Sequence, residues 1–101
     1  MTTEDLVRQA AARIDARDFG DALALCDQVL GTAPRHITAL INRGSALLGL
    51  GDPTQARRSF NRAINEDPTV GSAWDGLGKA QYELLQLDEA ARSFQIGRAH
   101  V

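Results

Sequence analysis

The sequence has little of what several kinds of functional site require. Its 101 residues include one cysteine, Cys26, and two histidines. A single cysteine cannot form an internal disulfide, and the sequence holds no zinc-ligand spacing. With so few histidines, no Ser/His/Asp catalytic order is supported. We therefore predict a chain that is not an enzyme and that uses no cofactor and no metal.

Net charge and long apolar runs are also scarce. The formal net charge is −2, which argues against a nucleic-acid partner because such partners usually need a basic face. No apolar run approaches the ~20 residues of a membrane span. The first residues lack the basic and apolar regions of a secretory signal. These features predict a cytoplasmic, bacterial-type protein with no membrane span.

Small and apolar residues are plentiful, and they recur at one fixed interval. Ala22, Ala56 and Ala90 follow one another at steps of 34 residues. Three more sets keep the same step: Cys26, Phe60 and Phe94; Leu6, Leu40 and Trp74; Ala10, Gly44 and Gly78. A fixed period of this size is typical of solenoid proteins. The alternative is a helical bundle in which the periodicity arose by chance.

The residues at these positions resemble a known repeat. The pattern Trp74-x-x-Leu77-Gly78, followed by Ala90-x-x-x-Phe94, resembles the tetratricopeptide repeat. The middle copy has Leu40, Gly44, Ala56-x-x-x-Phe60, Ala63 and Pro68, and the weaker first copy has Leu6, Ala10, Ala22-x-x-x-Cys26 and Pro34. Gln81 stands where the family has a tyrosine. The resemblance implies an all-α, right-handed α-solenoid of three helix-turn-helix repeats, about 3–36, 37–70 and 71–95, the last one truncated.

Turn and cap residues predict where the six helices lie. We expect helices over about 3–17, 21–30, 36–50, 54–65 and 70–84, and a sixth that begins near residue 88. Gly31 is expected to cap the second helix, and Pro34 prevents its continuation. Glycines 71, 76 and 78 each lower helix propensity by up to ~1 kcal/mol, so the fifth helix should depend on packing.

The last six residues do not follow the repeat. The hexapeptide at 96–101 matches one translation of a widely used sequencing adapter, which predicts that native sequence ends near Gln95. The alternative is an ordinary short tail. A solenoid normally ends in a repeat with a polar outer face. Here we expect Leu84, Leu87 and Phe94 to be exposed, and the array to self-associate through its uncapped last repeat.

The expected function is protein binding. Stacked helix pairs curve and create an extended concave surface, and the resemblance implies that the first helix of each pair lines it. The predicted groove residues are Val7, Ala11, Ile14, Ile41, Asn42, Ser45, Leu48, Asp75, Lys79 and Tyr82. Their mixture of apolar and polar side chains suits an extended peptide or a helix. For any one of them the alternative is plain solvent-facing helix surface.

The resemblance also raises two more specific functions, the binding of chaperone tails and the docking of substrates for a fused enzyme. Chaperone-binding members of the family hold a peptide carboxylate with two lysines, an arginine and two asparagines. The corresponding residues here are Val7, Ala11, Asn42, Ser72 and Gly76, of which only Asn42 matches, so we predict no binding of chaperone tails. Bacterial proteins that resemble this family often fuse such repeats to a glycosyl-, sulfo- or methyltransferase domain. The alternative function is therefore an N-terminal docking or regulatory segment of a larger enzyme.

Overall fold

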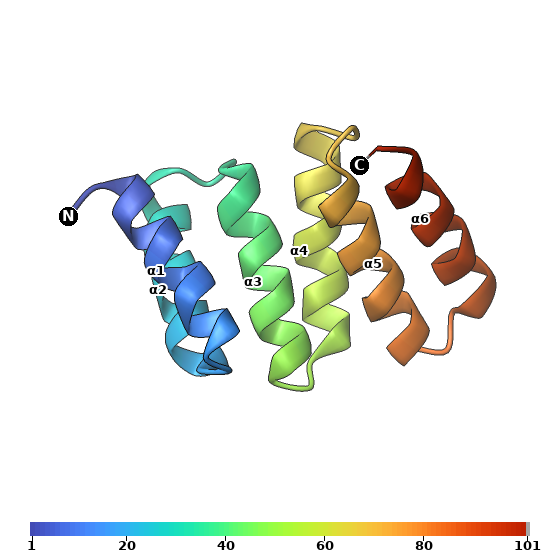
Figure 1. The fold of residues 1–101 in the computed structure, drawn as a ribbon, viewed down its shortest axis with the longest axis horizontal. Coiled ribbons are helices and arrows are strands. Elements are labelled where there is room, and N and C mark those ends of the chain that lie inside the picture. The colour runs from blue at the N-terminus through green and yellow to red at the C-terminus, as the bar shows by residue number, and fades with distance from the viewer. Residues whose placement is uncertain (101) are drawn as a thin grey trace.

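Six helices, packed one after another, form a row in the computed structural model, which describes residues 1–100 (Figure 1). In chain order they are α1 (Thr3–Asp15), α2 (Phe19–Thr32), α3 (Ile37–Gly49), α4 (Pro53–Glu66), α5 (Gly71–Glu83) and α6 (Leu87–Ala99). Successive helices pair as α1–α2, α3–α4 and α5–α6. The prediction of an all-α fold built from three helix pairs is confirmed.

The helices form two layers in a body of 41 × 25 × 20 Å. Each helix packs against its neighbours in the chain, and in addition α1 contacts α3 and α3 contacts α5. We call α1, α3 and α5 the inner helices, and α2, α4 and α6 the outer helices. Each hairpin therefore buries a face against the next hairpin, as the periodic apolar pattern requires.

Local signals in the sequence start and turn the helices. Thr2 forms a capping box with Asp5 at the start of α1, and the Asp52 side chain caps α4, where Pro53 is the first residue. Such caps satisfy backbone N–H groups that have no partner within the helix. The chain turns within each hairpin through a residue with positive φ at matching repeat positions: Arg17, Gly51 and Leu85.

Two helices run further than the sequence indicated. The second was expected to end at Leu30 with Gly31 as its cap, but α2 continues to Thr32, because nothing at Gly31 opposes another turn and Pro34 lies beyond. The sixth helix includes residues 96–99 of the supposed tail, and Gly97 is buried against α5. Val101 lies outside the described residues. The adapter origin of the tail stays a prediction.

The core is built from large rings beside small residues. Ala22, Ala56 and Ala90 are at most 2% exposed, so each hairpin closes tightly. The Phe60 ring is 1% exposed. It lies between two glycines, because a Cβ added to Gly44 or to Gly76 would come within 2.6 or 2.2 Å of it. Gly76, one of the glycines that weaken helix α5, therefore makes room together with Gly44 for the ring that joins α4 to α3 and α5.

Polar groups inside the array also link helices. The Arg43 side chain on α3 donates to Asp27 on α2 and to Ser59 on α4, both at 2.8 Å. Gln81, which replaces the family's tyrosine, is buried and accepts a hydrogen bond from Ser93 at 2.6 Å. Buried polar groups cost free energy unless they are paired. These pairs therefore fix how neighbouring helices meet.

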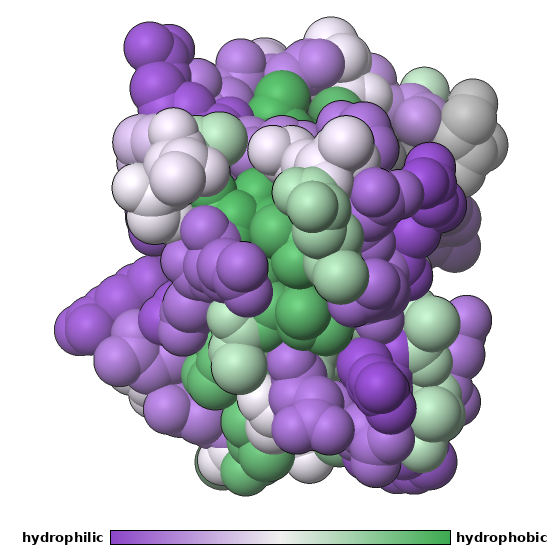
Figure 2. Space-filling view, turned by 90° about the vertical axis from the view of Figure 1, so that its left-hand side faces the viewer, coloured by the Kyte–Doolittle hydropathy of each residue, from purple (hydrophilic) through white to green (hydrophobic). Residues whose placement is uncertain are grey.

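Polar residues cover the α1–α2 end of the row only in part. Asp5 and Arg8, an ion pair on α1, hold the repeat positions that Ala39 and Asn42 hold on α3. Figure 2 views this end and shows a narrow hydrophobic band flanked by hydrophilic residues. At the α6 end the prediction of three exposed side chains was only partly right. Leu87 is 54% exposed, but Leu84 and Phe94 are partly buried.

Cys26 is expected to be chemically inert in the folded chain. It is 1% exposed, and burial, together with the Asp27 charge, raises the pKa of its thiol to about 11. With this pKa almost no thiolate is present near neutral pH, and the thiolate is the form of cysteine that reacts as a nucleophile. A disulfide exchange reagent added at neutral pH should therefore label the native protein far more slowly than the urea-unfolded protein. Equal rates in the two states would contradict the packing described for this residue.

Candidate functional site

A central pocket opens on the inner helices, where all three of them contribute side chains. Its volume is about 380 Å³. It is lined by Ile14, Ile41, Ser45, Leu48, Phe60, Ser72, Asp75, Gly76 and Lys79. Ile14 comes from α1, the serines come from α3 and α5, and the Phe60 ring reaches the pocket from α4 between the inner helices. The pocket combines apolar walls with two hydroxyl groups and one pair of opposite charges.

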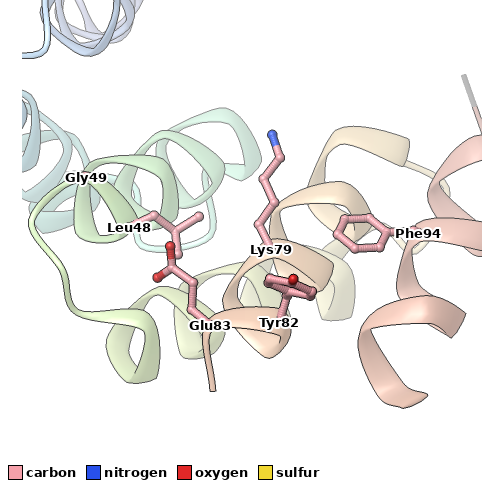
Figure 3. A pocket seen from close by; sticks show the side chains of 6 residues that line it. All are labelled: Leu48, Gly49, Lys79, Tyr82, Glu83 and Phe94. Atoms are coloured by element: carbon pink, nitrogen blue, oxygen red, sulfur yellow. The ribbon is translucent and has the colours of Figure 1, made fainter. Parts of the chain in front are cut away.

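A second pocket of about 540 Å³ continues the first toward α6. It is lined by Leu48, Gly49, Lys79, Tyr82, Glu83 and Phe94. In Figure 3, Leu48 and Phe94 stand on opposite sides of the α5 residues Lys79 and Tyr82. Because Leu48 and Lys79 line both pockets, the two form one groove that runs along the inner helices from α1 to α6. Below, "the groove" means these two pockets together.

Most of the groove residues predicted from the sequence lie in these pockets. Six of the ten line the central pocket: Ile14, Ile41, Ser45, Leu48, Asp75 and Lys79. Tyr82, which is 63% exposed, lines the second pocket. The remaining three residues lie elsewhere. Val7 is buried beside Val29 and Ala39. Ala11 is exposed but lines neither pocket, and Asn42 is partly buried.

Sequence reasoning missed two of the three aromatic rings of the groove. Phe60 and Phe94 were not among the predicted groove residues, and both reach a pocket. The signal was present in the opposing glycines, because a ring that rests on Gly44 and Gly76 can extend between α3 and α5 to the groove. Phe94 rests in the same way on Gly78. The period located both rings, but it did not show which part of each remains accessible.

The charges in the groove are few and mostly compensated. Lys79 Nζ lies 3.2 Å from Asp75 Oδ2, one helical turn away on α5. Both side chains are more than half exposed, so this pair contributes little to stability. Glu83 forms no ion pair with any residue in the range 1–100. The groove thus carries one excess negative charge, on Glu83 in the second pocket.

Residues 1–100 contain neither a cluster of possible metal ligands nor a helix that could span a membrane. No three His, Cys, Asp or Glu side chains in this part of the chain lie close enough together to hold a metal ion. No helix in the same range is long and apolar enough to cross a bilayer. The buried amide nitrogen of Asn42 has no hydrogen-bond partner in the described structure.

Sequence comparisons agree with this architecture. The family model of the tetratricopeptide repeat matches residues 13–80. Tetratricopeptide repeat protein 33 of Xenopus laevis is 30% identical over 77 residues, which cover 76% of this chain and 30% of that protein. FK506-binding protein-like of Mus musculus is 41% identical over 54 residues, which cover 54% of this chain and 16% of that protein. The chain thus spans less than a third of the length of either relative.

Solved structures share the fold along nearly the whole chain. The Sgt2 TPR domain from Aspergillus fumigatus superposes with a TM-score of 0.89 at 25% identity, covering 94% of this chain and 63% of that one. The second TPR of Spaghetti (RPAP3), bound to the HSP90 peptide SRMEEVD, gives a TM-score of 0.92 at 17% identity, covering 100% of this chain and 94% of that one. At such identities the second likeness concerns the fold alone.

Proposed function

Because the chain belongs to the tetratricopeptide repeat family, we propose that it is a non-catalytic scaffold that binds a peptide or a helix of a partner protein in the groove. The observation that carries this proposal is the continuity of the two pockets across all three inner helices. Together they form a long channel with apolar walls and a few polar groups. Peptide-binding sites use this combination to anchor side chains and fix their orientation.

The groove would bind mainly by burying apolar side chains of the partner. Ile14, Ile41 and Leu48 offer walls for an aliphatic or aromatic anchor, whose burial contributes about 25 cal/mol per Å². The hydroxyl groups of Ser45 and Ser72 can donate to or accept from a peptide backbone. Because α3 and α5 are held apart by the buried Phe60 ring, the groove exists before binding, which lowers the entropy cost of association.

The proposal is tested by obstructing the central pocket. The probe is a peptide selected against this protein from a random twelve-residue display library. Ser72 is exposed at the start of α5 and lines the central pocket, so Ser72→Arg should fill the pocket without disturbing the core. We expect a loss of at least about tenfold in affinity. Asn61→Arg, on the exposed side of α4, is the matched control and should bind normally. Unchanged affinity in Ser72→Arg would refute groove binding.

Chaperone tails are not expected among the partners. The positions that would hold a terminal carboxylate have no cation here, since they are Val7, Ala11, Ser72 and Gly76 beside Asn42. A carboxylate placed there would lose its charge-assisted hydrogen bonds. We therefore expect no detectable calorimetric signal with SRMEEVD at micromolar concentrations. The second TPR of Spaghetti (RPAP3), which was solved with that peptide, serves as the positive control. A low-micromolar Kd for this chain would contradict the prediction.

The second candidate function is a docking or regulatory segment of a larger bacterial enzyme, of the glycosyl-, sulfo- or methyltransferase type. The short span that this chain covers in its relatives leaves room for it. In that case the groove would hold a substrate protein for a neighbouring domain. Sequencing the genomic locus decides between the two, because a downstream transferase domain in frame favours the second. Cytoplasmic location and self-association through the last repeat remain proposals of the same kind.

A further inference from the structure

We propose that the second pocket of the groove recognises an arginine side chain of the bound peptide. This inference rests on the proposed function and specifies the partner. The two pockets differ in how their charges are paired. The central pocket contains a compensated ion pair, whereas the second pocket adds a carboxylate that has no ion-pair partner among residues 1–100, beside two aromatic rings. The charge and shape of this second pocket therefore select what can enter it.

The pocket walls suit a long side chain with an apolar stem. Leu48 on α3 and Phe94 on α6 stand on either side of the α5 residues, and Tyr82 lies between them (Figure 3). At about 540 Å³ the space lies within the usual 300–1,000 Å³ of ligand pockets. The three methylene groups of an arginine could be buried against one of these apolar walls, as such stems commonly are on apolar surface.

The charge at the end of the pocket is complementary to a cation. The Glu83 carboxyl group extends toward Leu48 in Figure 3, at the edge of the pocket. Lys79, which also lines the pocket, is 3.2 Å from Asp75, so its charge is already compensated. An entering cation therefore meets Glu83 without facing a free lysine charge. An entering carboxylate would be repelled by Glu83.

Arginine fits this pocket better than lysine or a purely apolar residue. Its planar guanidinium group can donate two parallel hydrogen bonds to a carboxylate, and it can also stack on an aromatic ring such as the exposed ring of Tyr82. The compact ammonium group of lysine cannot do both. An apolar side chain would desolvate Glu83 without offering it a partner, which costs free energy. The expected peptide therefore carries an apolar residue for the central pocket and an arginine next to it in the groove.

The test compares matched peptides and matched variants. The probe is the peptide selected from the random library, synthesised also with each of its arginines replaced by citrulline, which keeps the shape and removes the charge. We expect selected peptides to be enriched in arginine and their citrulline forms to bind about tenfold more weakly, as a cation–π contact and one ion pair together would give. Glu83→Gln should remove most of this preference. Glu89→Gln, an exposed residue of α6 that lines neither pocket, should retain it.

Three outcomes would overturn the assignment and leave groove binding intact. One is equal affinity for the arginine and citrulline peptides, in a complex that Ser72→Arg still weakens. The second is a preference for arginine that Glu83→Gln leaves unchanged, since the cation would then lie elsewhere. The third is enrichment of acidic residues among the selected peptides. Failure of Ser72→Arg to affect any selected peptide would instead refute the proposed function itself.

Discussion

Replacing Phe60 with alanine should lower the free energy of unfolding by about 3–5 kcal/mol, the usual cost of removing a buried aromatic ring. The ring is 1% exposed and lies between Gly44 on α3 and Gly76 on α5. It is therefore a central contact through which the middle hairpin packs on its successor. Because whole domains are stable by only about 5–15 kcal/mol, this variant should be largely unfolded in mild urea. Urea titration followed by circular dichroism measures the effect.

Phe94 provides the comparison, because it holds the matching position in the last repeat. It rests on Gly78, but its ring is only partly buried and also lines the second pocket. Phe94→Ala removes less buried surface and should cost clearly less than Phe60→Ala. Equal losses in the two variants would show that the buried position of Phe60 between the hairpins is not what stabilises the array.

Adding one methyl group at Gly76 should also destabilise the protein, although alanine is the better helix former. The new Cβ would lie 2.2 Å from Cε1 of Phe60. The ring cannot move away, because its other side already rests against Gly44, where an added Cβ would lie 2.6 Å from it. Overpacking of this kind costs about 1–3 kcal/mol, against a gain of up to ~1 kcal/mol in helix propensity. We expect a net loss of about 1 kcal/mol or more, measured by the same urea titration.

Gly31→Ala is the matched control for this effect. Gly31 also lies within a helix, but no atom lies within 4 Å of its added Cβ. This variant should gain roughly 0.5–1 kcal/mol from helix propensity alone. The double variant Gly76→Ala/Phe60→Leu replaces the ring with a smaller side chain and so relieves the clash. Its loss of unfolding free energy should be less than the sum of the losses in the two single variants. Stabilisation by Gly76→Ala would contradict the close approach of α4 and α5.

The fold could be predicted because it depends on period. Residues such as Ala22, Ala56 and Ala90 recur at one step. A hairpin that cannot bury its own apolar side must stack on a copy of itself. Helix starts are marked in the sequence where a side chain can cap them, as the Thr2 and Asp52 side chains do. The end predicted for the second helix at Gly31 was wrong, because a glycine permits a helix to end but does not force it to end.

The groove was harder to predict residue by residue. Position within the repeat placed Ile41 and Lys79 on the inner surface, where both line a pocket. The same reasoning placed Val7 there, but Val7 packs into the core against Val29 of α2 and Ala39 of α3. The share of the Phe94 ring that stays accessible depends on what covers α6. The period does not encode such end effects, and only the packed structure shows them.

Binding of partners along the inner helices is the central prediction for this protein. Amide chemical-shift mapping tests this directly when the library-selected peptide is titrated into the isotope-labelled protein. We predict that the largest shifts cluster on α1, α3 and α5, around Ile14, Ser45 and Ser72, and continue toward Tyr82. Shifts that gather instead on the exposed side of α2 and α4, around Asn61, would contradict the groove as the binding site.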